Sequence, residues 1–447
     1  MALSEALTLA IETLSWMELD GLSERSAFVK ASRQLGIGRL ESLKLAHMIV
    51  LETVKRRNFI DRIIHQEVTP ENFAKLTLGI KNFLRIYVYW TKFKKPSLQE
   101  AVSLAKLGRK ILGSKELKEV ELALGRLLPV DPKRILRECG SEEERVALRT
   151  GHPTWLVNYC FKFFGKPRAL KFFEFNARFK HVYLRVNTLK GDEGDLRGEI
   201  EEEGVELEEV EGLKHVYLLK GTRRPLTKLA SYRRGFFHIQ DKSSCFAALA
   251  TAPRPGDAVV DACAAPGGKT SFLAQLMENK GRIYSLDYSK ERMDLWRKEM
   301  VRMGVKNAEP ILCDVTKPLP LKLEADAVIL DPPCTGTGTL MKVPSMRWKF
   351  SPRMLKRFQG IQLSMLENCS RCVKVGGKLV YSTCSITLEE NELLIEKFLK
   401  FHPNFTLVPV EPPIGSPGFR GQSLCRRLYP HLHGSEGFFI AKMEREY

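Results

Sequence analysis

Apolar residues recur at helical spacing through the first 145 residues of the chain. The two clearest sets, spaced mostly three or four positions apart, are Leu7, Ile11 and Leu14, and then Ala46, Ile49, Val50 and Val54. Ser97 with Glu100 three residues later is the signature of a capping box at a helix start. Basic clusters such as residues 55–57 separate these stretches. We therefore predict a helical domain over residues 1–145, whose basic faces either bind RNA or are simply solvated.

Prolines and glycines mark the end of this helical region between residues 128 and 153. A second capping-box pair, Ser141 and Glu144, lies among them and predicts a helix in an otherwise broken stretch. We therefore place a linker helix at residues 146–167, between the helical domain and the strands that follow.

The pattern changes to short strands over residues 168–235. Residues 182–186, 205–210 and 215–219 have the composition or alternation of strands, and residues 195–203 form an acidic helix between them. This order predicts a small α+β unit of the ferredoxin-like type. Its acidic helix should face away from any bound nucleic acid.

Apolar runs then alternate with helical stretches to the end of the chain. The runs begin near residues 235, 258, 283, 310, 327, 379 and 438. Such alternation predicts an α/β fold with a doubly wound, Rossmann-like sheet. The last runs predict a C-terminal hairpin at its edge. We place this domain at residues 236–447.

The sequence AVVDACAAPGGK at residues 258–269 joins an apolar strand to a helix through a glycine turn. Gly267 and Gly268 allow the backbone to approach a ligand closely. Asp287, twenty residues past Gly267, ends the next apolar run, where a carboxylate can accept the hydroxyls of a ribose. The turn contains a proline and lacks the GxGxxG pattern that holds a pyrophosphate. It therefore favours a nucleoside without phosphates, such as S-adenosylmethionine, over a purely structural corner.

Reactive side chains follow the later strands of the predicted sheet. Asp314 follows the third strand, and Asp331 and Cys334 follow the fourth. Cys384 follows the fifth. Ligands bind beyond the carboxyl ends of the strands in such sheets, and neighbouring strands lie about 4.8 Å apart. If the fourth and fifth strands are neighbours, both cysteines face one pocket, with Asp331 between them and the cofactor.

The remaining cysteines have a simpler interpretation. A lone cysteine is usually a small buried hydrophobe, and this interpretation covers Cys139, Cys160, Cys245, Cys313 and Cys425. Cys369 and Cys372 form a CxxC pair in an apparent helix without a second pair, so we expect no zinc or redox site and no metal. Ten cysteines in a chain without a leader indicate reduced thiols.

The net charge of the chain indicates what kind of partner it binds. With 71 basic and 53 acidic residues, the chain carries +18, which favours a polyanion such as nucleic acid over charge that only serves solubility. We find no apolar run of about eighteen residues, so we expect no membrane span, and the N-terminus has the pattern of an amphipathic helix instead of a signal peptide. We therefore expect a cytoplasmic monomer. Eight glutamines and eleven asparagines among many Lys, Arg and Glu match the bias of heat-adapted proteins.

Several longer motifs resemble one known family. DACAAPGGKT, DPPCTGTG, YSTCS followed by EENE, and the closing RLYPHLHGSEGFF resemble the Sun/Fmu (RsmB-like) branch of the NOL/NOP/Sun family of RNA cytosine carbon-5 methyltransferases. GHPTWL, LRVNTLK and FFHIQDKSS match the same branch. The resemblance is strong over residues 150–447. Residues 1–145 resemble the NusB-type helical RNA-binding domain of that branch in pattern only.

The resemblance implies a site for S-adenosylmethionine. Its loop consists of Cys263, Ala264, Ala265, Pro266, Gly267, Gly268 and Lys269. By the same resemblance, Asp287 binds the ribose, Arg292 lies near the cofactor and Asp314 reads the adenine. It further implies that the unit at residues 168–235 binds RNA.

The resemblance also assigns the catalytic roles. Cys384 is the nucleophile and Cys334 is the second cysteine, needed to release the product. Asp331 contacts both the cofactor side and the target cytosine, and Lys269 helps to anchor that base. One departure is the segment after DPPC, which often has Arg-Arg before its proline in this branch and has Leu-Met-Lys-Val at residues 340–343 here.

The chemistry of cytosine explains why two cysteines are useful. Carbon 5 is a poor nucleophile until a thiolate adds at carbon 6, which splits one hard step into easier ones. Asp331, if protonated or sharing a proton, would bond to cytosine N3 and stabilise the charge of this adduct. Because a thiolate is required, we expect the pKa of the nucleophile to be lowered by Lys269 and by the positive sulfur of the cofactor. Composition alone does not rank the two cysteines, since DNA cytosine methyltransferases use the one in Pro-Cys.

Four alternatives remain open. A methyltransferase acting on base nitrogen would have an aromatic residue where Cys334 stands. A dehydrogenase of similar fold would need the missing GxGxxG pattern. A non-catalytic RNA-binding assembly factor could retain the same scaffold. Within the main hypothesis we favour ribosomal RNA over transfer RNA because of the NusB-like domain.

Overall fold

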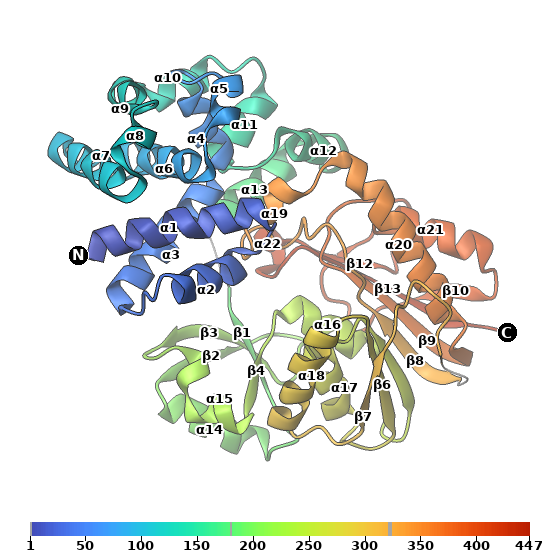
Figure 1. Cartoon of the computed structure of the whole chain (residues 1–447). Coiled ribbons are helices and arrows are strands. Elements are labelled where there is room, and N and C mark those ends of the chain that lie inside the picture. The colour runs from blue at the N-terminus through green and yellow to red at the C-terminus, as the bar shows by residue number, and fades with distance from the viewer. Residues whose placement is uncertain (1, 179–180, 321–323) are drawn as a thin grey trace. The chain divides into compact units, whose positions relative to one another are not determined.

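The helices and strands follow the predicted order, and the chain divides into two units. In the computed structural model, which describes residues 2–178, 181–320 and 324–447, one unit holds residues 1–178 with 340–349, and the other holds residues 179–339 with 350–447. Figure 1 shows the first unit built from helices and the second built from sheets flanked by helices. The predicted α/β class with a helical N-terminal region is confirmed.

The helical unit buries the apolar positions that the spacing singled out. Leu7, Ile11 and Leu14 lie in its core, as do Ala46, Ile49, Val50 and Val54. Its elements are α1 Ala2–Leu19, α2 Glu24–Gln34, α3 Leu40–Lys55, α4 Arg57–Ile64, α5 Pro70–Lys75, α6 Leu78–Tyr89, the π-helical turn Trp90–Lys94, α7 Leu98–Leu112, α8 Ser114–Leu117, α9 Glu121–Leu127, α10 Pro132–Arg137, α11 Glu142–Thr150, α12 Thr154–Phe164 and α13 Lys166–Arg178.

The two predicted helix caps differ. At α7, Ser97 and Glu100 form the complete capping box, each side chain bonding the other residue's backbone N–H. At α11, the Ser141 hydroxyl accepts the Glu144 N–H, but the Glu144 carboxylate accepts the N–H of Gly140 instead of Ser141. Both caps satisfy backbone donors that the first helical turn leaves without an intrahelical partner.

Residues 340–349 belong to the helical unit, although they follow the DPPC motif in sequence. The buried Arg347 side chain, 2% exposed, donates to the backbone oxygens of Gly151 at 2.8 Å and Asn176 at 3.2 Å. The Trp348 indole N–H donates to the Val54 oxygen at 2.8 Å. Because these bonds satisfy backbone carbonyls, the segment with its short helix α19 Met346–Lys349 is an integral part of this unit.

The smaller sheet of the second unit is fully antiparallel, with strand order β2-β3-β1-β4. Its elements are β1 Tyr183–Val186, α14 Glu193–Glu202, β2 Val205–Glu209, β3 Val216–Thr222, α15 Ala230–Arg234 and β4 Phe237–Ile239. A β-α-β-β-α-β order is that of the ferredoxin-like type. The assignment of residues 235–239 to the large sheet is wrong, because β4 pairs with β1, Leu184 facing Ile239. A three-residue strand does not encode its partner locally.

The larger sheet has the order β11-β12-β13-β9-β8-β5-β6-β7, with β10 paired to β13. The five strands from β9 to β7 are parallel, and β13 runs antiparallel to β9. Its strands are β5 Ala258–Ala262, β6 Arg282–Asp287, β7 Ala308–Leu312, β8 Ala325–Leu330, β9 Val373–Thr383, β10 Phe405–Val408, β11 Ser416–Pro417, β12 Arg426–Leu428 and β13 Phe438–Arg445. The neighbouring positions of β8 and β9 confirm the condition on which the predicted cysteine pocket depends.

Alternate residues of each parallel strand pack on opposite faces of this sheet. On one face, Val259 and Ile329 pack with residues of α16 Lys242–Thr251 and α17 Gly268–Leu276. On the other face, Val260 and Leu330 pack with residues of α20 Pro352–Ser370 and α21 Glu392–Phe401. The sheet is thus buried on both faces, as its nearly continuous apolar strands require. Figure 1 shows these helices around the strands.

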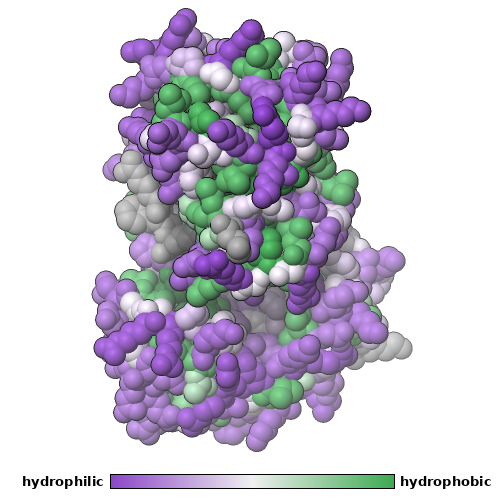
Figure 2. Space-filling view, turned by 60° about the vertical axis from the view of Figure 1, so that its left-hand side comes forward, coloured by the Kyte–Doolittle hydropathy of each residue, from purple (hydrophilic) through white to green (hydrophobic). Residues whose placement is uncertain are grey.

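On the face that Figure 2 shows, hydrophilic side chains predominate, and hydrophobic residues lie among them in small groups. Within the described part of the chain, we find no helix long and apolar enough to cross a membrane.

Candidate active site

The predicted cofactor turn connects β5 to α17. Gly267 has φ of +111°, a conformation that side chains rarely adopt, and a Cβ there would lie 2.6 Å from the Met300 methyl group. Gly268 begins α17, so the backbone N–H groups of its first turn lack intrahelical partners and are free to bind a ligand. The local sequence therefore needs glycine here for both conformation and space.

Asp287 ends β6 and ties that strand to the turn. Its carboxylate is 1% exposed and accepts the Ala265 N–H at 3.3 Å. Arg292, in the first turn of α18 Lys290–Met303, lies 3.0 Å from the same carboxylate and also donates to the Ala265 oxygen. Two residues predicted to serve the cofactor thus also brace its loop.

Asp314 lies just beyond β7, the strand next to β6. Its side chain is 44% exposed, and one carboxylate oxygen accepts the N–H and the hydroxyl of Thr316 at 3.0 and 2.7 Å. These hydrogen bonds lower the pKa of Asp314 below its usual value. The Cys313 N–H donates to the Asp287 oxygen at 3.1 Å, which keeps Asp314 close to the ribose candidate. Its position suits recognition of an adenine edge.

Lys269 and Asp331 form an ion pair between the first turn of α17 and the end of β8. Burial alone would lower the pKa of Lys269, but the adjacent Asp331 carboxylate outweighs it and raises that pKa. Lys269 is therefore a fixed positive charge at the carboxyl end of the sheet.

Cys334 and Cys384 meet beside this ion pair. Cys384 directly follows β9, Cys334 lies four residues beyond β8, and their Sγ atoms are 3.1 Å apart. The predicted proximity of the two thiols is confirmed. The structure differs from the expected lowering of the nucleophile's pKa. The hydrogen bond with Cys334, burial and the negative charge of Asp331 raise the pKa of Cys384 well above its usual range. Lys269 does not reverse this shift because Asp331 pairs with it.

Glu390 joins the two cysteine segments, a role that the sequence motifs did not predict. It is fully buried and accepts hydrogen bonds from the Thr335 N–H at 2.8 Å and from the Thr335 and Ser385 hydroxyls at 2.6 Å each. Thr387 at 2.8 Å and Gln362 at 3.0 Å donate as well. All these partners are donors, as an acceptor-only carboxylate requires. The available signal was a hydroxyl residue directly after each cysteine.

Seven further cysteines, outside the cofactor loop and the thiol pair, differ in burial. Cys160, Cys245, Cys369, Cys372 and Cys425 are buried, while Cys139 and Cys313 are half-buried, so full burial is wrong for those two. Among the described residues, we find no group of three or more His, Cys, Asp and Glu placed to hold a metal ion.

Comparison with known proteins gives consistent matches. A family model described as 16S rRNA methyltransferase RsmB/F matches residues 248–444. The probable ribosomal RNA small subunit methyltransferase B of Bacillus subtilis (strain 168) is 35% identical over 309 residues, which span 68% of each chain. The tRNA (cytosine(72)-C(5))-methyltransferase of Pyrococcus horikoshii is 37% identical over 227 residues, which span 49% of this chain and 55% of that protein.

A solved structure extends the likeness to the whole chain. The crystal structure of PH0851 superimposes with a TM-score of 0.85 at 32% identity and covers 99% of both chains. The helical unit is therefore part of the shared architecture. From the matched family model, the Bacillus relative and this common fold, we conclude that the chain belongs to the RsmB/F family of methyltransferases.

Proposed function

We propose that the protein transfers a methyl group from S-adenosylmethionine to carbon 5 of cytosine in RNA. The observation that carries this proposal is the pair of thiols 3.1 Å apart at the ends of β8 and β9. Methylation of cytosine at carbon 5 uses one thiol to attack the ring and a second group to help release the methylated base from that thiol. Relatives named for this reaction support the same conclusion.

The cofactor would lie along the turn and the strand ends already described. Asp287 and Asp314 would hold its ribose and adenine, with Arg292 bracing Asp287. When bound, S-adenosylmethionine supplies the methyl group on a positively charged sulfur. The backbone N–H groups at the start of α17, which have no partner within the helix, would bind its polar edges.

Cys384 is the nucleophile in this proposal, on the strength of the family resemblance. Its thiolate adds to carbon 6 of cytosine, and the electron pair released into the ring lets carbon 5 take the methyl group. Cys334, in contact with Cys384, then assists loss of the carbon-5 proton, and Cys384 leaves as a thiolate. Asp331 shares a proton with cytosine N3, which stabilises the charge of the adduct, and Lys269 keeps Asp331 in place.

The raised pKa of Cys384 has a consequence for specificity. A thiol that stays protonated reacts slowly with electrophiles in water. In the protein without cofactor, Cys384 is therefore held mainly as a thiol. We infer that activation depends on assembly of the complete complex.

The proposal also specifies which class of RNA is methylated. The Bacillus relative is named for small-subunit ribosomal RNA, and the Pyrococcus relative for transfer RNA. The ribosomal-RNA relative matches 68% of this chain, whereas the transfer-RNA relative matches 49%. We therefore propose ribosomal RNA as the substrate of a monomeric, cytoplasmic enzyme. The molar mass of the purified protein, measured by light scattering, tests whether it is a monomer.

Incubation with tritiated S-adenosylmethionine and total RNA of the source organism tests the reaction. After separation by size and digestion to nucleosides, we expect label in 5-methylcytidine within ribosomal RNA. Label in transfer RNA would instead identify transfer RNA as the substrate. Cofactor binding without any label in naked RNA or in precursor ribosomal particles would support the assembly-factor alternative.

Substitution of each cysteine tests the assigned roles. We expect Cys384→Ala to reduce methylation to background, because no thiolate is left to attack. Cys334→Ala should accumulate a covalent RNA–protein adduct, visible as a shifted band in denaturing gels. Cys139→Ala, a half-buried cysteine in the helical unit, should behave as the unsubstituted protein. An adduct trapped in Cys384→Ala would invert the two roles.

A further inference from the structure

A groove of about 620 Å³ lies in the small α+β unit, and none of its lining residues takes part in the proposed reaction. The end of α14, the turn after β3 and helix α15 form its walls (Figure 1). Most of its side chains are cationic, and the basic residues are Arg223, Arg224, Lys228, Arg233 and Arg234. All five are exposed. The groove therefore presents positive charge to an approaching ligand.

The overall charge of the small unit does not explain this groove. Residues 183–239 contain eleven acidic and ten basic residues, so the unit is close to neutral, yet half of its basic residues line one groove. By contrast, Arg197 pairs with Glu201 at 2.9 Å and Lys220 pairs with Glu208 at 2.8 Å. Because charges of one sign repel each other when they are gathered, this segregation indicates a site for an anion.

The cations of the groove are mostly unpaired. Arg234 pairs with Glu199 at 2.9 Å, and no other cation of the lining has a carboxylate within ion-pair distance among the described residues. Of the two glutamates in the lining, Glu203 accepts the N–H and the hydroxyl of Ser231 at 2.9 and 3.2 Å, so its carboxylate fixes the first turn of α15. The lining as a whole keeps a net positive charge.

The turn that carries Arg223 and Arg224 is held in place by backbone contacts. The Arg223 N–H donates to the Gly204 oxygen at 3.2 Å, and the Thr222 hydroxyl donates to the Arg224 oxygen at 2.6 Å. Gly204 has φ of +82°, and a Cβ there would lie 2.8 Å from the Arg223 Cδ, so the Arg223 side chain lies directly over this glycine. The cations thus project from ordered backbone, which lowers the entropic cost of binding a ligand.

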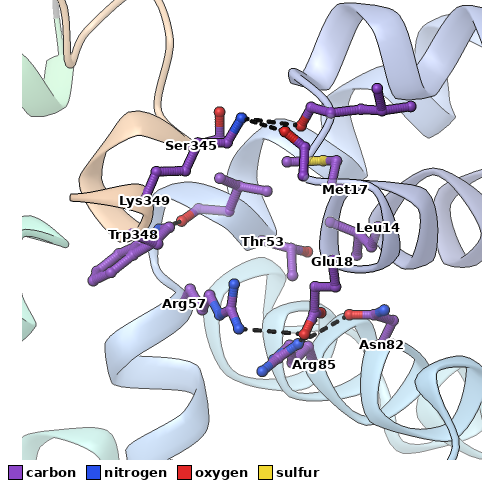
Figure 3. A pocket seen from close by; sticks show the side chains of 13 residues that line it. Leu14, Met17, Glu18, Thr53, Arg57, Asn82, Arg85, Ser345, Trp348 and Lys349 are labelled. Atoms are coloured by element: carbon purple, nitrogen blue, oxygen red, sulfur yellow. Dashed lines mark hydrogen bonds and ion pairs between the residues drawn. The ribbon is translucent and has the colours of Figure 1, made fainter. Parts of the chain in front are cut away.

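The cavity of the helical unit differs from the groove in this respect. It measures about 330 Å³, and α1, α3, α4, α6 and residues 345–349 surround it (Figure 3). Its Glu18 accepts from Arg57 at 3.3 Å and from Arg85. Its Lys349 donates to two backbone oxygens at 2.7 and 3.4 Å. These charges are satisfied within the protein, whereas those of the groove are not.

The lining of the groove suits phosphates better than bases. Guanidinium groups are planar and bind phosphate oxygens through two parallel N–H bonds. Among the described residues of the lining, none is aromatic, so no ring is available to stack on an unpaired base. Phosphate contacts fix the position of a nucleic acid without reading its sequence. The groove therefore matches the backbone of an RNA.

We propose that this groove binds phosphates of the substrate RNA backbone, independently of the RNA sequence. This inference rests on the proposed function insofar as RNA is the substrate, and it names the residues that hold the RNA. The groove and the two thiols belong to the same unit of the chain. A backbone held in the groove raises the effective concentration of the target base at the thiols.

Binding of a fluorescent single-stranded RNA to the full chain, without cofactor, tests the groove. Arg224→Gln and Lys228→Gln each remove a cation whose side chain has no hydrogen bond or ion pair with the described residues, so the fold should be unchanged. We expect each to weaken binding about fivefold at about 0.1 M salt and to reduce the slope of log affinity against log salt by about 0.7, as loss of one phosphate contact does. Lys228→Arg keeps the charge and should bind normally.

Lys220→Gln is the matched control, because Lys220 is an exposed lysine of the same unit, paired with Glu208 and outside the groove. It removes the same charge and should leave the affinity within about twofold. Equal losses for Lys220→Gln and Lys228→Gln would overturn the proposal, since net charge alone would then explain binding. Losses that vary with RNA sequence, or competition by inorganic pyrophosphate as strong as by RNA, would overturn it as well.

Methylation kinetics separate this inference from the proposed function. With Arg224→Gln and Lys228→Gln combined, the KM for RNA should rise about twentyfold, while kcat and the KM for S-adenosylmethionine stay nearly constant. Methylation with an unchanged KM for RNA would contradict the groove alone. Loss of RNA binding in these variants of a protein that forms no 5-methylcytidine would contradict the proposed reaction alone.

Lysine modification gives an independent position for the bound RNA. An N-hydroxysuccinimide ester of acetic acid acetylates exposed lysines, and bound RNA should protect Lys228 while Lys220 stays reactive, as mass spectrometry of peptides would show. Equal reactivity of Lys228 with and without RNA would contradict the proposal, even if the affinity changes were as expected.

Discussion

Glu390 holds the two cysteine segments together from the interior of the protein. Thr335 and Ser385, the residues directly after the two cysteines, both donate to one of its oxygens at 2.6 Å. The neighbouring Asn391 holds the Cys384 segment alone, since its amide donates to the Ser385 oxygen at 2.9 Å. The Sγ–Sγ distance therefore depends on a buried carboxylate that touches neither thiol, which makes Glu390 a positioning residue.

Glu390→Gln should damage the reaction more than cofactor binding. An amide presents two hydrogens to partners that are themselves donors, and the Thr335 N–H cannot reorient. Hydrogen bonds to a charged group contribute about 1.5–3 kcal/mol each, so we expect kcat to fall roughly ten- to a hundredfold. The KM for S-adenosylmethionine should stay nearly constant, as steady-state kinetics would show.

Glu396→Gln serves as the control, because this exposed glutamate lies on the same stretch of chain, in α21. It should retain full activity. Unchanged kcat in Glu390→Gln, or a parallel rise in KM with kcat intact, would contradict the positioning role.

Strand β4 and helix α18 are joined by a buried charge cluster. Glu299 of α18 contacts His238 of β4 at 2.6 Å and also pairs with Arg302. Burial would raise the pKa of Glu299, but the hydrogen bonds from His238 and Arg302 outweigh it and lower that pKa to about 2. Burial lowers the pKa of His238 below its usual value. This cluster connects the smaller sheet to the methyltransferase sheet.

The pH dependence of stability follows from the lowered pKa of Glu299. Its contribution is fully present above about pH 4.5, the ordinary value, and is lost as the pH falls towards 2. The shift corresponds to about 3 kcal/mol at neutral pH. Glu299→Gln should therefore lower the free energy of unfolding in urea at pH 7, and the difference from the unsubstituted protein should shrink between pH 4.5 and pH 3.

Glu309→Gln is the comparison for that measurement. Glu309 pairs with Arg282 on the surface, where both side chains are more than half exposed, so its removal should change stability by less than about 1 kcal/mol at every pH. A difference for Glu299→Gln that did not vary with pH would contradict the charge argument.

Positive charge is a property of the whole molecule and not of one site. Seventy-one basic residues against 53 acidic residues leave a net charge of +18, and hydrophilic side chains predominate on the face that Figure 2 shows. The small α+β unit offers a group of basic side chains at Arg223, Arg224, Lys228, Arg233 and Arg234. Phosphate contacts of this kind supply affinity without sequence preference.

RNA affinity should therefore fall steeply with salt. With six or more phosphate contacts, we expect a loss of roughly a thousandfold between 50 and 200 mM salt, since each contact releases a counterion. Filter binding of RNA across that range measures the slope. A nearly flat dependence would show that the net charge does not face the RNA, whereas S-adenosylmethionine binding should hardly respond.

Local pattern was sufficient for most elements and for the chemistry of the motifs. The spacing of Leu7, Ile11 and Leu14, close to 3.6 residues, identifies a helix face. The glycines at the Gly267 turn identify a tight turn. Both features depend only on residues that are close together in the sequence. Motif resemblance supplied the roles of Cys384 and Cys334, which composition does not rank. Elements and candidate residues could therefore be predicted from the order of amino acids alone.

Only the tertiary structure brought distant residues together. Cys334 and Cys384 are fifty residues apart, and their contact exists because β8 and β9 are neighbours. Strand pairing likewise placed β4 in the smaller sheet, and packing placed residues 340–349 in the helical unit. The raised pKa of Cys384 and the hydrogen bonds that converge on the buried Glu390 carboxylate arise from burial and from long-range contacts. Sequence thus determined the elements and reactive groups through short-range periodicity, while long-range packing alone decided their distances, burial and charge.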